Sequence, residues 1–574
     1  MNSESSNKTP FDQVLAFGAG GIIPIALFNI AGQLMGLIGN ISLGLSAFLL
    51  GTIMIIPRLW DAVSDPIMGN ITDNTRSRWG RRRPYILIGG CMVAVSFILM
   101  WWIPQGEWIR SIFPEESAYQ WFQLAYILFW LIVFFTSCTV FEIPHGALGM
   151  EMSSDSHERT RLFSAKSFMG NLFAMGTPWL FALANMEFFK GVGGNEADGM
   201  RYVSILVAVV LIPLCVWSFL KLREPGFEIA KKQKKLPFWK EFRHTMKNKN
   251  FLILIMIIFT LAMGFNFVGL LGYYIPIFYI FEGNKDAAGP LLGFNGTIWA
   301  LTGLLAVFPL NYLAKRSGKK TTLIIAISLM VCAQLSKIVC YNPSYPYLIV
   351  IPTILLSIGM LFFFTLGSSM VGDICDEDDL KSGQRAEGSY YSIFWWFIKM
   401  GTAFASFVTG LLITFVDFNE VQVKSSDIIS GKLKESLSLV ESKDKYNQDT
   451  LKTQVTATIA ELDHFILSLN EKEVDEHNTQ LLVVCQAIRQ ELKSIDLTKD
   501  DIPSIQSDLS SSLWQSQSLT LQSPQTLFWM RAVEIVLPLL LCAISLLFTL
   551  YYPLDEERCL EIQAALAERN KKLD

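Results

Sequence analysis

Long apolar segments alternate with short polar ones along most of the chain. About 20 mainly apolar residues are needed to cross the hydrocarbon core of a bilayer, which is about 30 Å thick. Windows of that length predict twelve membrane spans, at residues 13–38, 45–69, 84–104, 121–149, 162–185, 201–221, 250–280, 290–314, 320–341, 346–371, 387–416 and 525–552. The leader Met1–Pro10 is polar and has no basic region or cleavage motif, so we expect the first span to be retained.

The composition agrees with a membrane protein. Of 574 residues, 51% are hydrophobic and 17% are charged, whereas roughly 25% are charged in an ordinary soluble domain. This is too little charge to cover the surfaces of several soluble domains. The nine cysteines have no metal-ligand spacing, and neither a disulfide framework nor a cofactor is expected.

Basic residues concentrate in alternate loops. Five arginines follow the second span, ten bases lie between Lys221 and Lys249 after the sixth, and four follow the eighth. Because basic loops face the cytoplasm, we expect a multi-pass protein of the cell (inner) membrane with both termini cytoplasmic.

The spans divide into two sets of six. Gly80-Arg81-Arg82 follows the second span and Gly318-Lys319-Lys320 follows the eighth, which are corresponding places in the two sets. A parallel repeat of six spans is the plan of one large class of secondary transporters. We therefore predict an all-α membrane protein with five parts: a six-helix bundle (1–221), a basic linker (222–249), helices 7–11 (250–416), an acidic insertion (417–524), and helix 12 with a cytoplasmic tail (525–574).

The insertion differs from the rest of the chain. It holds 18 acids and 10 bases, a net charge of −8, whereas the remainder is at +4. Apolar residues recur at helical spacing from Leu451 to Leu492, which predicts two or three amphipathic helices. We interpret the insertion as an extracytoplasmic cap or spacer. A domain that handles substrate or binds a partner is the alternative.

Several ionisable residues lie inside the predicted spans. Each costs about 2.5–3.5 kcal/mol at the bilayer centre, so a group of them needs a reason. Arg58, Asp61 and Asp65 are spaced i, i+3, i+7 and share one helical face. If they share a cavity with Glu142 of the fourth span and Lys399 of the eleventh, the charges sum to −1. A proton or a monovalent cation would balance that charge. Simple buried ion pairs, Arg58 with Asp61 and Lys399 with Glu142, are the alternative.

Aromatic residues in the spans give weaker evidence. Trp60, Phe141, Trp299, Trp395 and Trp396 could offer flat faces to a sugar ring. Most aromatics in such a chain pack in the core or lie at the membrane interface, and that is the ordinary interpretation of each one.

Two adjacent segments resemble a known family. The residues 58–69 (RLWDAVSDPIMG) and 73–84 (DNTRSRWGRRRP) are similar to the glycoside–pentoside–hexuronide:cation symporters, the melibiose-permease-like branch of the major facilitator superfamily. Further matches are Glu142-Ile143-Pro144, the run Gly383–Gly388, and Lys399 with Gly401. The resemblance implies two six-helix bundles of the major facilitator fold, and it does not cover the insertion between helices 11 and 12.

The resemblance also implies roles for individual residues. The implied cation-site residues are Asp61, Asp65, Ser64, Thr139 and Glu142, with a monovalent cation on Asp61 and Asp65 if Na⁺ is the ion. Arg58 and Lys399 are the implied charge-pair and coupling residues. The implied substrate-binding residues are Glu142, Lys399, Asn29, Trp395 and Trp396, and the implied cytoplasmic gate is Asp73, Arg76, Arg81 and Arg82.

Two departures from the family pattern affect specificity. Ser64 stands where members often have Asn, so both Na⁺ and H⁺ remain candidates for the coupling ion. Ile23 stands where the melibiose branch has a sugar-binding acid, so an α-galactoside is not implied.

The expected function is symport, coupled to Na⁺ or H⁺, of a glycoside, oligosaccharide or uronide by alternating access. The expected partners are a small sugar substrate and the lipid bilayer, with no nucleic acid, and the expected state is a monomer. The alternatives are a cation-linked lipid or lysolipid carrier and a non-transporting sensor with the same fold. Against a polytopic enzyme, the spans and loops carry no His/Cys metal cluster and no Gly-x-Ser-x-Gly motif.

Overall fold

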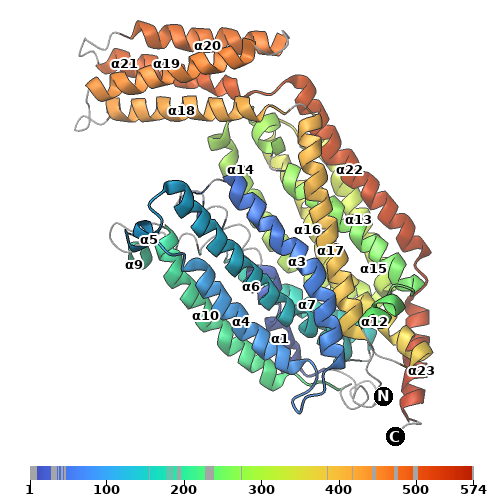
Figure 1. Ribbon diagram of the computed structural model, residues 1–574. Coiled ribbons are helices and arrows are strands. Elements are labelled where there is room, and N and C mark those ends of the chain that lie inside the picture. Colours follow the sequence, from blue (N-terminus) through green and yellow to red (C-terminus); the bar gives the residue numbers. More distant parts are fainter. Residues whose placement is uncertain are drawn as a thin grey trace.

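The computed structural model is built from helices (Figure 1), and it contains no β-strand in the part of the chain that it describes. The described residues are 9–27, 35, 38–39, 43, 45, 47–105, 107–153, 155–176, 180, 183–184, 186–190, 196–225, 238–272, 274–383, 386–416, 418–441, 448–470, 476–495 and 502–571.

The first half of the chain forms one group of helices, the N-terminal bundle. Its long helices are α3 (Ala47–Asn74), α4 (Arg83–Trp101), α6 (Glu116–Glu151), α7 (Ser156–Ala174) and α10 (Glu196–Lys221). Shorter elements are α1 (Phe11–Ala19), η1 (Ile23–Leu27), α5 (Glu107–Ile112) and α9 (Glu187–Lys190). The helix α4 packs between α6 and α10, and α3 packs on α6.

The second half forms the C-terminal bundle. Its helices are α12 (Phe238–Thr245), α13 (Lys249–Leu271), η2 (Ile275–Ile280), α14 (Lys285–Leu305), α15 (Val307–Cys340), η3 (Pro346–Ile349), α16 (Val350–Ser382), α17 (Glu387–Phe415), α22 (Pro524–Tyr551) and α23 (Glu556–Lys571). A kink divides α15 at Gly318, whose φ of 76° lies in the left-handed region that favours glycine. The predicted eighth span therefore corresponds to α14 with the first part of α15, and the ninth to the rest of α15.

The described helices include seven that are long and apolar enough to cross a membrane: Arg83–Trp101, Ser117–Glu151, Ala197–Lys221, Lys249–Val268, Val307–Cys340, Pro346–Ser382 and Pro524–Tyr551. The chain is thus a multi-pass membrane protein. The number twelve and the boundaries of the five parts stay predictions.

The two bundles meet at one end of the molecule and diverge toward the other (Figure 1). Across their junction α3 packs on α17, and α7 packs on α15 and α16. The loop between α3 and α4 and the helix α23 lie at the end where the bundles meet, which we call the gate end. The insertion lies at the opposite end.

The described residues of the insertion form four α-helices, more than the two or three predicted from the stretch Leu451–Leu492. They are α18 (Glu420–Glu441), α19 (Gln448–Asn470), α20 (Glu476–Ser494) and α21 (Ile502–Ser516), followed by η4 (Gln517–Thr520). The undercount has a physical reason: α18 and α21 bury serines, including Ser426 and Ser516, where an apolar pattern would show large residues. The buried Ser426 hydroxyl donates to the backbone carbonyl of Ser516 (3.4 Å), and Ser430 bonds the Ser516 hydroxyl (2.9 Å).

The insertion has a hydrophobic core of its own, to which Leu462, Phe465, Cys485 and Leu509 belong. Burial raises the pKa of the Cys485 thiol to about 12, so this cysteine is a packing residue. The four helices pack on one another in a ring, α18 on α19 and α21, and α20 on α19 and α21.

The root of the insertion is fixed to the C-terminal bundle. Phe418 contacts the rings of Tyr274 and Phe278 at 5.3 and 5.1 Å. The backbone amide of Asn419 donates to the Gln522 side chain (3.0 Å), so the chain enters and leaves the insertion at one place. The two ends of the insertion are therefore held together beside the C-terminal bundle.

We predict that the insertion unfolds as a unit separate from the transmembrane body. Leu462→Ala, at a fully buried position of α19, should lower the local free energy of unfolding by about 2–5 kcal/mol through the cavity it leaves. The matched control Leu467→Ala lies on the same helix at a position 64% exposed and should change it by less than about 0.5 kcal/mol. Hydrogen exchange of the full chain would measure both. Faster exchange in α13 or α22 as well as in the insertion would contradict a separate unit.

Candidate functional site

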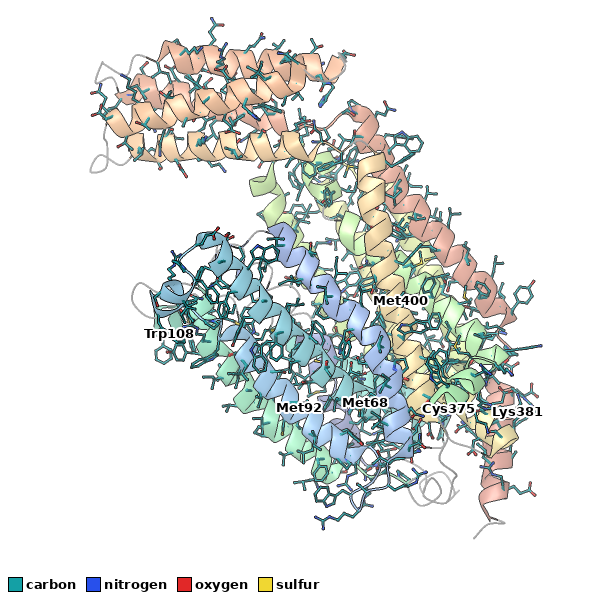
Figure 2. All side chains as sticks on the ribbon, in the orientation of Figure 1. Met68, Met92, Trp108, Cys375, Lys381 and Met400 are labelled. Atoms are coloured by element: carbon teal, nitrogen blue, oxygen red, sulfur yellow. The ribbon has the colours of Figure 1, made fainter. Side chains whose placement is uncertain are left out.

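Two buried aspartates on α3 and a lysine on α17 join the bundles. The side chains of Asp61 and Asp65 are 1% and 0% exposed, on the helix face that their spacing predicts. Lys399 Nζ lies 3.0 Å from Asp61 Oδ2 and 2.7 Å from Asp65 Oδ2. Figure 2 labels Met68, three residues after Asp65 on α3, and Met400, next to Lys399 on α17. One cation from the C-terminal bundle is therefore shared by two acids of the N-terminal bundle.

The two aspartates differ in their other bonds. Thr139 Oγ1 on α6 donates to Asp65 Oδ1 (2.7 Å), so both oxygens of Asp65 are occupied. Among the described residues, Asp61 Oδ1 and the buried hydroxyl of Ser64 have no hydrogen-bond partner. The Arg58 guanidinium lies over the ring of Phe135, 4.8 Å from its centroid. The structure thus brings Asp61, Asp65, Thr139 and Lys399 together.

Glu142 belongs to a second cluster. Its Oε1 binds Lys166 Nζ of α7 and accepts a hydrogen bond from the Tyr391 hydroxyl of α17 (2.9 Å). Lys166 also donates to that hydroxyl (3.2 Å). The alternative of an ion pair between Lys399 and Glu142 is wrong, because each of them has another partner.

Lys166 was not among the predicted site residues, although its position inside the fifth predicted span indicated a buried charge that needs a partner. With it, the described site holds three cations, Arg58, Lys166 and Lys399, against three acids. The net charge of −1 inferred from the sequence is therefore wrong, because the formal charges of these six residues sum to zero. Lys399 therefore occupies the aspartate oxygens to which the sequence analysis assigned a cation.

Aromatic rings surround the second cluster. Trp395 contacts Tyr391 edge to face with centroids 6.2 Å apart, and it stacks on Phe364 at 6.4 Å. The buried indole nitrogens of Trp395 and Trp396 have no hydrogen-bond partner within the described part of the chain. Buried donors without partners are typical of a site that binds a polar ligand.

The other candidates have structural partners or lie elsewhere. Trp60 Nε1 donates to Thr136 Oγ1 (2.9 Å), and Trp299 stacks on Phe265 at 5.9 Å. Phe141 is 1% exposed in the core, and Ile23 is 2% exposed there. Asn29 lies outside the described residues.

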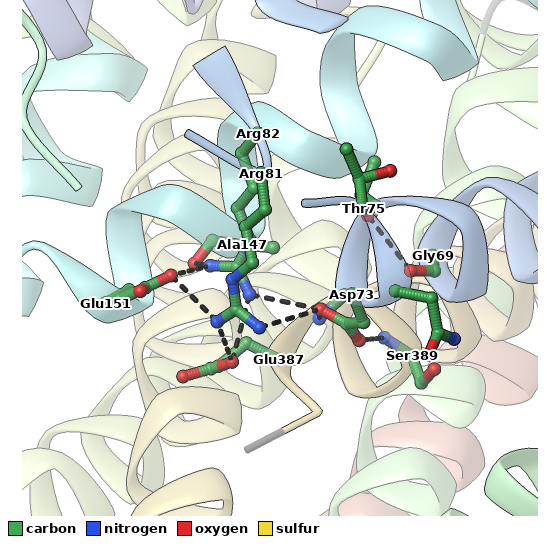
Figure 3. Close-up of polar contacts among 12 residues, drawn as sticks. Gly69, Asp73, Thr75, Arg81, Arg82, Ala147, Glu151, Glu387 and Ser389 are labelled. Atoms are coloured by element: carbon green, nitrogen blue, oxygen red, sulfur yellow. Dashed lines mark hydrogen bonds and ion pairs between the residues drawn. The ribbon is translucent and has the colours of Figure 1, made fainter. Parts of the chain in front are cut away.

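Two arginines in the loop between α3 and α4 lie among carboxylates of both bundles (Figure 3). Glu387 Oε2 at the start of α17 is 3.0 Å from Arg81 Nη2 and 2.9 Å from Arg82 Nη2. Glu151 binds the same arginines at 3.0 and 2.6 Å, and Arg82 also binds Asp73 at 3.2 Å. These contacts close the gate end around buried charges.

The backbone of α17 completes this network. Asp73 accepts hydrogen bonds from the backbone amides of Gly388 (3.1 Å) and Ser389 (2.9 Å). A Cβ at Gly388 would lie 2.8 Å from the Asp73 carboxylate, so only glycine allows this approach. Arg76, which follows α3, donates instead to the backbone carbonyls of Asp73 and Thr75. Glu224, after α10, accepts from the Arg81 amide (3.0 Å), and burial raises its pKa.

A second ionic network at the gate end was not predicted. Arg159 at the start of α7 binds Asp373 (2.5 Å) and Asp376 (2.6 Å) of α16, and Lys319 binds Asp373 at 2.7 Å. The signal was present in the repeated turns: Gly80 and Gly318 both have positive φ, 105° and 76°. The basic residue after each glycine contacts an acid near the end of a long helix.

Hydroxyl groups continue the contact between α7 and α16 away from the gate end. Ser156 donates to Asp373 (2.9 Å), Thr160 bonds Ser369 (3.0 Å), and Ser167 bonds Thr365 (2.9 Å). The partners on α16 are spaced by four residues, so they lie on one helix face. The bundles are therefore joined from the gate end up to the level of the site.

Two membrane-spanning helical bundles with buried polar groups at their interface are the architecture of secondary transporters. The comparisons with known proteins agree. The family described as "MFS/sugar transport protein" matches residues 39–440, more than half of the chain, and the chain belongs to this family of major facilitator transporters.

Similar proteins carry transporter names. The isoprimeverose transporter of Lactiplantibacillus pentosus is 26% identical over 376 residues, covering 65% of this chain and 73% of its own. The sodium-dependent lysophosphatidylcholine symporter 1-A of Danio rerio is 23% identical over 429 residues, covering 67% and 74%. A structure of the proton:xylose symporter XylE bound to 6-bromo-6-deoxy-D-glucose is 13% identical, covers 70% of this chain and 88% of that one, and has a TM-score of 0.51, which shows the shared fold.

The ion pairs predict an asymmetric rescue in double variants. Lys399→Ala should lower the stability of the purified protein by about 3–5 kcal/mol, because it leaves two buried aspartates with one cation fewer. Adding Asp61→Asn should recover most of this loss. The matched double variant with Glu142→Gln should recover none, because Glu142 is paired with Lys166. Thermal melting would measure the series, and equal rescue by both second changes would show that the acids share one charge balance.

Proposed function

We propose that the protein is a cation-coupled symporter for a glycoside, oligosaccharide or uronide, working by alternating access. The observation that carries the proposal is the shared ion pair of Lys399 with Asp61 and Asp65. These three groups belong to different bundles, so whatever changes their bonding changes how the bundles are held together. Na⁺ and H⁺ are the candidate ions.

The coupling step is an exchange of cations. Na⁺ is a hard cation that takes oxygen ligands, which Asp61, Asp65, Thr139 and Ser64 supply. A proton would act on the Asp61 carboxylate, which has a free oxygen. In either case the incoming charge displaces Lys399 from the aspartates. The site is neutral before that step, so it carries one positive charge afterwards, and a lysine becomes available to the substrate.

The substrate position is the cluster of Glu142, Lys166, Tyr391 and Trp395. A carboxylate, an ammonium and a phenol can bond sugar hydroxyls, and the faces of Trp395 and Trp396 can pack on the ring. The likeness to an isoprimeverose transporter supports a sugar-containing substrate. A uronide carboxylate would balance the charge of the co-transported cation, whereas a neutral glycoside would leave the loaded site at +1.

Uphill uptake tests this function. Proteoliposomes with an imposed Na⁺ or H⁺ gradient should accumulate a labelled glycoside from a panel, and dissipating the gradient should abolish the accumulation. Asp65→Asn should still exchange substrate but not accumulate it, because the ligand that the cation shares with Lys399 is lost. The matched control Asp198→Asn, at an acid paired with Arg201 at the start of α10, should accumulate substrate like the wild type.

A lysolipid is the second candidate substrate, favoured by the likeness to the Danio rerio symporter. The same proteoliposomes would receive labelled lysophosphatidylcholine in a parallel assay. Gradient-driven uptake of the lysolipid alone would replace the glycoside proposal. Folded protein that accumulates neither class would leave the sensor as the function.

We also propose that the gate end faces the cytoplasm of the cell (inner) membrane and the insertion faces outside, because the basic turns lie at the gate end. Ser438 on α18 and Arg78 after α3 are both exposed. In a cysteine-depleted background, Ser438→Cys should react with an impermeant maleimide in cells whose inner membrane is intact. Arg78→Cys should react only after that membrane is permeabilised. The reverse pattern would invert the orientation.

A further inference from the structure

The last helix, α23, lies at the gate end and is docked on the C-terminal bundle. Cys559 and Ile562 are buried against α15 and α16. Arg569 Nη2 binds Asp379 Oδ1 of α16 at 2.9 Å. These contacts attach α23 to the C-terminal bundle. The proposed symport mechanism uses none of them, so the role of α23 needs another explanation.

One ion pair connects α23 to the other bundle. His157 Nε2, in the first turn of α7, lies 2.8 Å from Glu556 Oε1, in the first turn of α23. Gly318 lets the glutamate sit close to the kink of α15, since a Cβ there would be 2.9 Å from Glu556 Oε2. The imidazole and the carboxylate are 28% and 34% exposed, so protons from solution reach the pair.

Three charged groups face the imidazole from the elements around it. Glu556 lies on α23, and Asp155 precedes α7 and accepts a hydrogen bond from the His157 backbone amide (2.7 Å). Lys319 lies on α15, where its ammonium is bound to Asp373 at 2.7 Å. Two acids against one paired base favour the protonated imidazole, and the hydrogen bond to Glu556 raises the pKa of His157.

Opening of the gate end must separate α7 from α16 and α23. Three cross-bundle arginines, Arg81, Arg82 and Arg159, stay charged at any physiological pH, but a histidine changes charge near pH 6.5. Once α7 moves away, His157 loses Glu556 and its pKa returns toward the ordinary value. The closed form therefore binds the proton more tightly. The stabilisation of the closed form by this pair is complete below the ordinary pKa of histidine. It is lost as the pH rises through the raised pKa of His157 in the closed form.

We propose that His157 and Glu556 form a pH-sensitive latch between α7 and α23, which holds the gate end closed when the solution on that side is acidified. The latch goes beyond the proposed function, because it concerns the opening of one end whatever the substrate or coupling ion. On the cytoplasmic side it would slow delivery of substrate and cation into an acidified cell.

A buried reporter at the junction tests the latch. Ser369 on α16 is fully buried against Thr160. In a cysteine-depleted background, a cysteine introduced by Ser369→Cys should react with maleimide only when the bundles separate. The alkylation rate of this reporter would be measured at about pH 6 and about pH 8. Each rate would be divided by the rate of the same reporter in a His157→Gln background at the same pH. This division removes the pH dependence of the thiol itself. The ratio should be about two- to fivefold lower at the acid pH, the range expected for a partly exposed ion pair.

Two further variants separate the latch from a general effect of pH. Glu556→Gln should remove the pH dependence as His157→Gln does, with helix content and melting temperature unchanged. His244→Gln should keep it, because His244 bonds Asp378 of α16 (3.1 Å) and touches neither partner of the latch. A ratio that does not change with pH, or a Glu556→Gln variant that responds like the wild type, would overturn the proposal.

Discussion

Burying charge inside a membrane is costly, and this cost explains how the bundles are joined. A buried ammonium or carboxylate is tolerated only with a partner, and removing one partner costs more than the pair contributes. Here the partners are distributed between the bundles: Lys399 with Asp61 and Asp65, and Glu387 with Arg81 and Arg82. The bundles cannot separate at the gate end unless other charges or water replace these bonds. Under the proposed function, an incoming cation would replace the bonds of Lys399, which makes ion pairing the link between cation binding and movement.

The parts of the site that the sequence predicted were those encoded by local spacing. Asp61 and Asp65 share a helix face because their spacing requires it. A lone lysine in the eleventh span was expected to pair with an acid, because an unpaired ammonium is costly there. Partner choice between distant helices was not encoded in that way. Glu142 was expected in the Lys399 cluster, but α7 brings Lys166 closer to it. Periodicity gives the face of one helix, whereas the pairing of two faces depends on how the helices cross.

The fold was predictable to a similar extent. Apolar length and basic loops predicted a two-bundle membrane transporter, and the family match confirms that class. The insertion shows the limit: α19 and α20 have clear apolar stripes, while α18 and α21 bury serines whose hydroxyls bond backbone carbonyls. Small polar residues can fill a core when their hydrogen bonds are satisfied internally, and a hydropathy pattern does not register them.

A single helix connects the three features that distinguish this chain. The helix α17 begins at the gate with Glu387, carries Lys399 at the site, and ends at Phe415, three residues before Phe418 at the root of the insertion. A helix is stiff over such a length, because each residue is bonded to the next turn. Under the proposed function, displacement of Lys399 and release of Glu387 would therefore move one rigid helix. The insertion begins beside the end of that helix, where Phe418 packs on Tyr274 and Phe278. One helix thus joins the gate residue Glu387 to the site residue Lys399 and ends beside the root of the insertion.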